Sequence, residues 1–344
     1  MRNLWPIFFL AALTPCVEFL TGSTSFLGLF AALPMSAIPF VAITLPGYIF
    51  PVLLIRDALV AWSKGWASLL GLGIAYGAVN EGLLAKTYFV VNPLSPPLGP
   101  GGGLGRWLGV NWPWVTEISL FHMVVSISVP VVLGFLIFPE TRAVRFLSRG
   151  AIRWMIAFLL VEITAIIALQ SIVGDYRSLL PLYPLPIAVV LGGIYLARRM
   201  PRPDSRRTLE GGFGRPVPLG LAGLGFFVVM FLPILGFFPI AFVATPVLAD
   251  GLYRLGAASG VVAAVYPLAC AGLAMRFFSR YTLGDVQLLA LVTGVMIVPM
   301  AHAVSTLDFA VGAPVAAALY LAAILLARSR ILKRAESPTT SAAV

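Results

Sequence analysis

The chain has 344 residues, of which 60% are hydrophobic and only 10% are charged, and its mean hydropathy is +0.99. Soluble domains are about half apolar and about a quarter charged, so this composition excludes an ordinary soluble domain and predicts an all-α integral membrane protein. The net charge of +10 at pH 7 would suggest a nucleic-acid partner in a soluble protein, but the placement of the basic residues explains it differently.

The chain contains ten apolar segments that could span a bilayer, which requires about 20 mostly apolar residues. Glycine and proline are both plentiful, as is more usual in membrane helices than in soluble ones. The sequence therefore predicts a polytopic helical bundle of about ten transmembrane helices. In chain order the predicted spans are 3–22, 33–55, 65–88, 113–137, 151–173, 179–198, 217–237, 258–277, 282–303 and 308–328.

The basic residues fall on alternate sides of these spans. With a cytoplasmic N-terminus, 19 of the 23 Lys and Arg residues lie on the cytoplasmic side, and only Lys86, Arg106, Arg177 and Arg254 lie on the other. Basic loops stay in the cytoplasm, so we expect both termini to be cytoplasmic and the protein to lie in the cell membrane. The basic side would face membrane lipids, and no nucleic-acid partner is expected.

The stretch from Pro216 to Leu248 is apolar for more than 30 residues and contains several prolines, so it is not expected to form one straight helix. We expect a span that ends near Phe237, followed by a re-entrant or interfacial piece near 238–255. Two full spans here would invert the rest of the chain and place Arg276 and Arg280 outside, against the distribution of basic residues.

The predicted spans divide the chain into four regions and leave one distinctive loop. Residues 92–112, rich in Pro, Gly and Trp, form an extracytoplasmic loop that cannot be regular helix and serves either as a spacer or as a lid. The regions are a membrane bundle at 1–198, a basic cytoplasmic linker at 199–216, a second membrane bundle at 217–330 and a disordered cytoplasmic tail at 331–344.

Ionisable side chains inside a span are costly and usually face a bundle interior or a wet cavity. The first span carries Glu18 in its outer third, directly before the sequence TGSTS, which includes Thr21, Ser23 and Thr24. We expect this sequence to break the helix. A broken helix end exposes backbone groups that can hold a polar ligand.

The third span carries polar residues beside a small-residue motif. Gly73 and Gly77 form G-x-x-x-G, and Glu81 continues the same face one turn further on. Small residues let a neighbouring helix approach closely, so Glu81 is expected to point into a helix contact. Tyr76 and Asn80 lie four residues apart on an adjoining stripe.

The fourth span places Glu117 in its first turn and His122 about a third of the way down. Ser119, His122 and Ser126 fall on one face by i, i+3, i+7 spacing. Lys86, near the outer end of the third span, is expected to extend outward to the membrane surface. Glu81 and His122 are thus expected at the same depth, in the outer half of the bundle.

We expect most of these groups to converge beneath the outer membrane surface, although each also fits a purely structural role. A protonated Glu81 bonded to Asn80 would serve packing alone, and Glu117 would favour the helix N-terminus. The candidate substrate- or proton-binding residues are Glu18, Thr21, Ser23, Thr24, Tyr76, Asn80, Glu81, Glu117 and His122.

Three functions from different classes fit this arrangement. A secondary transporter of a small solute would use Glu18 or Glu81 to bind and release a proton, and this is the leading expectation. An intramembrane enzyme acting on a lipid or lipid-linked substrate would use Glu81 and His122 as its catalytic acid–base pair. The third alternative is a structural or assembly subunit of a membrane complex.

The remaining motifs add no cofactor. Cys16 and Cys270 are the only cysteines, no metal-binding spacing occurs, and we expect neither a metal nor a cofactor. The sequence NEGLLAK followed by SLFH lacks the paired Glu, the Arg and the second His motif of the glutamate-dependent intramembrane proteases. Association into a homo-oligomer is left open.

Overall fold

The computed structural model describes residues 4–20, 45–91, 102–103, 105–173, 180–203, 207–209, 214–230, 257–305 and 312–336. Within these residues the fold is helical, apart from two pairs of two-residue strands. Seven helices among them are long and apolar enough to cross a membrane. The all-α bundle predicted from composition is therefore what the described part of the chain forms.

Seven of the ten predicted spans correspond to these helices. The other three, 3–22, 33–55 and 217–237, lie partly outside the described residues, so the number ten stays a prediction. The expected re-entrant piece near 238–255 lies wholly outside them. Of the tail predicted as disordered at 331–344, residues 331–336 continue the helix Gly312–Glu336, so disorder is wrong there, and the rest lies outside the described residues. The observed spans are Trp66–Leu84, Trp112–Ile137, Arg149–Ala168, Leu180–Arg199, Val261–Arg280, Asp285–Val304 and Gly312–Glu336.

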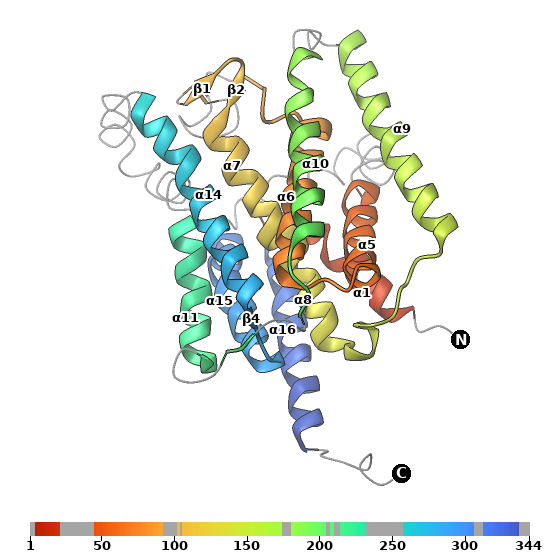
Figure 1. Ribbon diagram of the computed structural model, residues 1–344, viewed down its shortest axis with the longest axis vertical. Helices are drawn as coiled ribbons and strands as arrows, with labels where there is room; N and C mark the ends of the chain where they lie inside the picture. Colours follow the sequence, from red (N-terminus) through yellow and green to blue (C-terminus); the bar gives the residue numbers. More distant parts are fainter. Residues whose placement is uncertain are drawn as a thin grey trace.

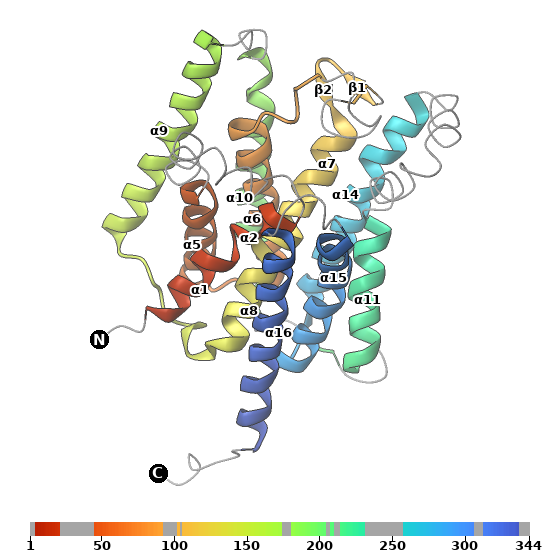
Figure 2. The same ribbon diagram turned by 180° about the vertical axis from the view of Figure 1, so that it is seen from behind.

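Two composite helices form the centre of the bundle, and each contains a π-helical segment. α6 (Trp66–Gly77) runs directly into the π-helix η2 (Ala78–Leu84). α7 (Trp112–Phe121), the π-helix η3 (His122–Ser128) and α8 (Val129–Ile137) follow one another without a break. The two composite helices pack against each other through α6 and η3 (Figures 1 and 2).

The other helices surround this pair. α10 and α14 pack against α6, α14 also packs against α7, and α16 packs against α8, while α15 packs between α11 and α16. α9 contacts α5 and η2 and exposes most of its apolar side chains. Their bounds are α1 (Trp5–Leu13), α2 (Cys16–Leu20), α5 (Leu45–Ala61), α9 (Arg149–Val173), α10 (Pro184–Arg199), α11 (Pro216–Met230), α14 (Ala257–Arg280), α15 (Asp285–Ser305) and α16 (Gly312–Glu336).

The connections that carry most basic residues gather at one end of the bundle, the lower end in Figure 1. In Figure 1, α5, α8, α10, α14 and α16 run downward to their ends, and α6 and α9 run upward from their beginnings. β3 (Arg207–Thr208) pairs in parallel with β4 (Tyr281–Thr282) at the same end. α11 begins and α14 ends at this end, which agrees with the expected placement of Arg215 and Arg280 on one side.

A buried ion pair holds the connection after α8 at this basic end. Arg56 Nη1 lies 3.0 Å from Asp57 Oδ1, and the two side chains are 2% and 1% exposed. The two carboxylate oxygens of Asp57 accept the backbone N–H groups of Phe146 at 2.7 Å and Leu147 at 3.1 Å. Arg56 donates to the carbonyl of Thr141, so the pair fastens α5 to the segment between α8 and α9.

The opposite end carries a short antiparallel hairpin formed by β1 (Arg106–Trp107) and β2 (Val110–Asn111). Arg106 donates to the carbonyl oxygens of Gly109 at 3.0 Å and Phe89 at 3.3 Å, which ties the hairpin to the chain that follows η2. Asn111 is the N-cap of α7, because its side chain accepts the N–H of Trp114 at 3.2 Å. The hairpin thus fixes where α7 begins.

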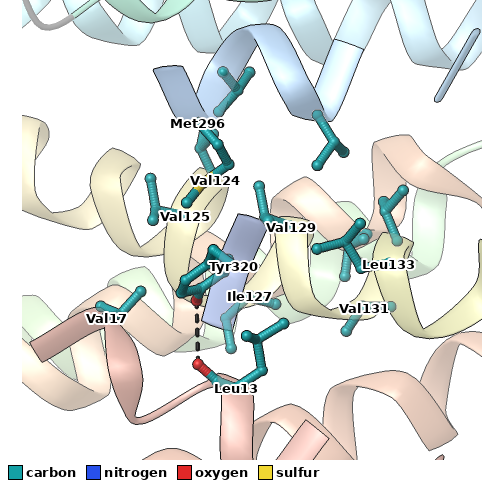
Figure 3. Packing of buried hydrophobic residues seen from close by; sticks show 14 of the residues in the cluster. Leu13, Val17, Val124, Val125, Ile127, Val129, Val131, Leu133, Met296 and Tyr320 are labelled. Atoms are coloured by element: carbon teal, nitrogen blue, oxygen red, sulfur yellow. Dashed lines mark hydrogen bonds between the residues drawn. The ribbon is translucent and has the colours of Figure 1, made fainter. Parts of the chain in front are cut away.

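Buried aliphatic side chains fill the middle of the bundle. Figure 3 shows Val124, Val125 and Ile127 of η3 packed with Val129, Val131 and Leu133 of α8 and with Met296 of α15, all almost fully buried. Leu13 of α1 and Tyr320 of α16 meet in the same cluster, where the Tyr320 hydroxyl donates to the Leu13 carbonyl at 3.2 Å. Along η3 and α8 the residues of this apolar cluster follow His122, the first residue of η3.

Candidate functional site

The site is built on a close approach of the two central helices. A Cβ atom added to Gly73 would lie 2.7 Å from Cα of Met123, and one added to Gly77 would lie 2.7 Å from Cα of Ser119. Carbon atoms do not approach so closely, so only glycine permits this backbone contact. The predicted close approach at this G-x-x-x-G motif is confirmed, and its neighbour is the helix formed by α7 and η3.

This contact brings Glu81 of η2 against His122, the first residue of η3. Oε1 of Glu81 lies 2.8 Å from Nε2 of His122, and the side chains are 10% and 2% exposed. Both residues lie in π-helical segments, which are rare and often occur at functional sites. The predicted partnership of these two residues is therefore a direct contact across the central helix pair.

Neighbouring groups orient the imidazole of His122. Its Nδ1 lies 2.7 Å from the hydroxyl oxygen of Ser126, one turn further along η3. Asn80 Nδ2 lies 3.1 Å from Nε2 and donates to the Tyr48 hydroxyl oxygen at 3.1 Å. Both ring nitrogens therefore have partners, and the ring is fixed with Nε2 toward the carboxylate.

Glu81 is held on its other side by residues beyond η2. Thr87 donates its hydroxyl hydrogen to Oε2 of Glu81, and Nε1 of Trp114 donates to the same Thr87 oxygen at 2.9 Å. A hydrogen-bonded series therefore runs from Trp114 through Thr87, Glu81 and His122 to Ser126. We call these five residues the Glu81 relay. It begins near the hairpin end and enters the bundle.

Two tyrosines enclose the relay. The Tyr76 ring meets the His122 ring edge-on, with centroids 5.4 Å apart, and Tyr48 lies 5.9 Å from Tyr76 in a similar arrangement. Both tyrosines are almost fully buried. The polar atoms of Glu81 and His122 therefore lie in an environment of low dielectric constant, where electrostatic interactions are stronger than in water.

The arrangement can hold a proton in either of two places. With the proton on Glu81, the carboxyl group donates to Nε2 and the Nδ1–H group donates to Ser126. With the proton on Nε2, the imidazole donates to an ionised Glu81, which Thr87 also stabilises by its hydrogen bond. A carboxylate and an imidazole in direct contact, each with a second oriented partner, form an acid–base pair.

The structure brings together only part of the predicted set. Tyr76, Asn80, Glu81 and His122 meet as described. Thr21, Ser23, Thr24 and the side chain of Glu18 lie outside the described residues, so their part in the convergence stays a prediction.

Two expectations about individual residues are wrong. Glu117 lies in the second turn of α7, which begins at Trp112, and it turns toward α14 instead of the relay. Lys86 does not extend to the membrane surface, because its side chain is fully buried. The backbone of Lys86 has φ +61°, which turns the chain sharply at the end of η2 and redirects the side chain.

Three members of the site were not predicted: Tyr48, Thr87 and Trp114. The sequence did not indicate Thr87 and Trp114 as site residues because the chain turns back after η2. Helical periodicity does not predict such a turn. Tyr48 comes from α5, and its contact with Asn80 depends on how α5 packs against α6. One signal for Trp114 was available in the sequence. Asn is a favoured N-cap, so Asn111 indicates where α7 begins and places Trp114, three residues later, in its first turn.

Comparisons with protein-family models, with curated proteins and with solved structures found no match for this chain. Within the residues that the structure describes, no three His, Cys, Asp or Glu side chains lie together in a way that could hold a metal ion. The geometry of the relay is therefore what indicates the function.

Proposed function

We propose that the protein is an intramembrane enzyme that uses Glu81 and His122 as an acid–base pair on a lipid or lipid-linked substrate. The observation that carries this proposal is the 2.8 Å contact between Oε1 of Glu81 and Nε2 of His122, with both side chains fixed by further hydrogen bonds. A carboxyl group with a purely structural role needs only one hydrogen-bond partner. A catalytic pair needs two groups that are both held in position and can exchange a proton.

In this mechanism Glu81 accepts a proton from a water molecule or a hydroxyl group as that oxygen attacks the substrate. His122 then takes the proton from Glu81 and supplies it to the leaving group, so the pair returns to its starting state. Ser126 and Thr87 keep the imidazole and the carboxylate aligned during the transfer. The substrate would approach from the hairpin end, which we propose faces away from the cytoplasm.

The position of the relay favours a substrate from the membrane. His122 begins η3, and the residues of η3 and α8 that follow it belong to the apolar cluster of Figure 3. A one-sided polar site suits an enzyme that receives and releases its substrate on the same side.

A secondary transporter is the second candidate, and the two facing π-helices favour it. A π-helical turn has a wider backbone spacing and can shift to α-helix, which would move Glu81 relative to His122. Transport would also require the apolar cluster to open toward the basic end. A structural subunit, the third class, has no need of the relay.

The test uses the purified full-length protein in lipid nanodiscs, with acyl-labelled phosphatidylglycerol or phosphatidylethanolamine as probe and mass spectrometry of the products. Glu81→Gln and His122→Asn should each lower turnover by about 10²–10⁴-fold. Glu140→Gln, at an exposed carboxylate outside the relay, should leave turnover unchanged.

The same proteins in liposomes containing a pH-sensitive dye test the transporter. Proton movement that depends on Glu81, without any lipid product, would contradict the proposed enzyme and support the transporter. Folded Glu81→Gln protein with unchanged turnover and unchanged proton movement would contradict both.

A further inference from the structure

Glu117 lies on the opposite side of α7 from the Glu81 relay. Ser119 of α7 faces Gly77 of α6 in the close backbone contact. Two residues along an α-helix correspond to a rotation of about 200°, so Glu117 faces away from α6. The helix on that side is α14, which packs against α7. Glu117 therefore belongs to a separate place in the fold.

The carboxyl group of Glu117 is buried without a hydrogen bond. The residue is 1% exposed, and neither carboxyl oxygen has a hydrogen-bond partner among the described residues. No salt bridge involving Glu117 is found among these residues either. An isolated carboxylate at membrane depth is very unfavourable, so the group is neutral there, either because it carries a proton or because a bound cation balances its charge.

The facing helix offers oxygen atoms instead of hydrogen-bond donors. Pro267 lies inside α14, and because proline has no N–H group, the carbonyl of Ala263 loses its helical partner. Ala263, Pro267 and Cys270 lie on the buried face of α14. α14 therefore has a backbone carbonyl without its usual partner in the turn that leads to Pro267.

Two polar side chains of α14 lie within electrostatic range of Glu117. Tyr266 and Cys270 lie one turn apart on α14, and both are close enough to interact electrostatically with Glu117. The Tyr266 hydroxyl is a further oxygen on the same stretch of α14. Carboxylate, carbonyl and hydroxyl oxygens are the ligands that hard cations prefer, and interrupted membrane helices often supply them.

We propose that Glu117 and the kinked part of α14 form a binding site for a monovalent metal cation such as Na⁺. The single negative charge of Glu117 indicates a cation with a single positive charge, because the occupied site is then neutral within the membrane. Glu117 supplies the charged ligand, the Ala263 carbonyl and the Tyr266 hydroxyl supply neutral ligands, and the ion links α7 to α14. This proposal does not depend on the proposed enzymatic function.

The test measures thermal unfolding of the purified full-length protein in detergent, in NaCl and in choline chloride of equal concentration. Because a ligand that binds only the folded state stabilises it, Na⁺ should raise the Tm by a few degrees in a saturable manner. Glu117→Gln should lose this Na⁺-dependent shift. Glu140→Gln, at an exposed carboxylate, should keep it in full.

A second variant keeps the test decisive if Glu117→Gln does not fold. Pro267→Ala restores the helical hydrogen bond of Ala263 and leaves Glu117 intact, so it should weaken the apparent Na⁺ affinity severalfold without loss of folding. Binding of radioactive ²²Na⁺ gives a direct second readout. A Tm that is equal in NaCl and choline chloride, or a Na⁺ shift that survives in Glu117→Gln, would overturn the proposal and leave a carboxyl group held neutral by a proton.

Discussion

Gly77 and Ser119 bring the two central helices together so closely that no side chain fits between their backbones. Gly77 lies one turn before Glu81, and Ser119 lies one turn before His122. The spacing of the acid–base pair is therefore set by this glycine.

Gly77→Ala should lower the free energy of unfolding by about 1–3 kcal/mol, because its Cβ would lie 2.7 Å from Cα of Ser119 and push the helices apart. Thermal unfolding in detergent measures the change. Gly272→Ala in α14 is the matched control, since no atom lies within 4 Å of the added Cβ, and it should be neutral or slightly stabilising. Equal effects of the two substitutions would show that helix propensity, and not the contact, determines stability.

Asp57→Ala should destabilise the protein by about 3–5 kcal/mol, because it leaves the buried Arg56 guanidinium without a counter-charge and frees two backbone N–H groups. Chemical unfolding followed by tryptophan fluorescence measures the loss. Asp285→Ala removes ion pairs to Arg142 and Arg334 that are partly exposed, and it should cost about 0–1 kcal/mol. A larger cost at Asp285 than at Asp57 would contradict this ranking.

Thr87→Val should lower turnover in the proposed enzymatic reaction while leaving the KM nearly unchanged, because Thr87 positions Glu81 and is not expected to hold the substrate. Thr87→Ser retains the hydroxyl group and should restore most of the activity. Trp114→Phe removes only the bond from Nε1 to Thr87 and should have an intermediate effect. A rise in KM with unchanged kcat would assign Thr87 to substrate binding instead.

Lys86 should make stability depend on pH in the alkaline range. It lies beyond the span Trp66–Leu84, and burial lowers its pKa from 10.5 to about 8. Between pH 8 and pH 10.5 the unfolded chain therefore holds a proton that the folded protein has released, and stability should rise with pH across this window.

The measurement is Tm against pH for the wild-type protein and for Lys86→Met. The variant keeps an unbranched apolar side chain but cannot titrate, so its Tm should rise less across the window. Parallel Tm curves for the two proteins would show that the side chain of Lys86 does not titrate there.

Spacing along the chain was enough to predict several residues of the site. The four-residue spacing of Gly73, Gly77 and Glu81 predicts a helix face with a close contact and a carboxylate at its end, because helical periodicity determines which residues share a face. The same spacing argument places Ser126 beside His122. Depth indicated His122 as a possible partner, since adjacent spans run in opposite directions and bring Glu81 and His122 to one level, but it indicated Glu18 of the first span as well.

Other features required the packed structure. Tyr48, Thr87 and Trp114 join the site from three different segments, and no periodicity connects them. The Lys86 side chain was expected to extend outward because the residue lies at the end of a span. In the structure a left-handed backbone conformation at Lys86 buries the side chain instead. Glu117 shared a depth with Glu81, but depth does not determine which side of α7 a residue occupies.

Composition and charge by themselves determined that this chain is an apolar helical bundle whose basic loops lie at one end, because burying backbone polar groups in lipid permits little else. Only the tertiary structure decided which faces of those helices meet. It placed Glu81 against His122 and turned Glu117 toward α14. The physical reason is that hydrophobicity separates lipid from water but hardly distinguishes one helix neighbour from another, so the pairing depends on close packing between particular side chains.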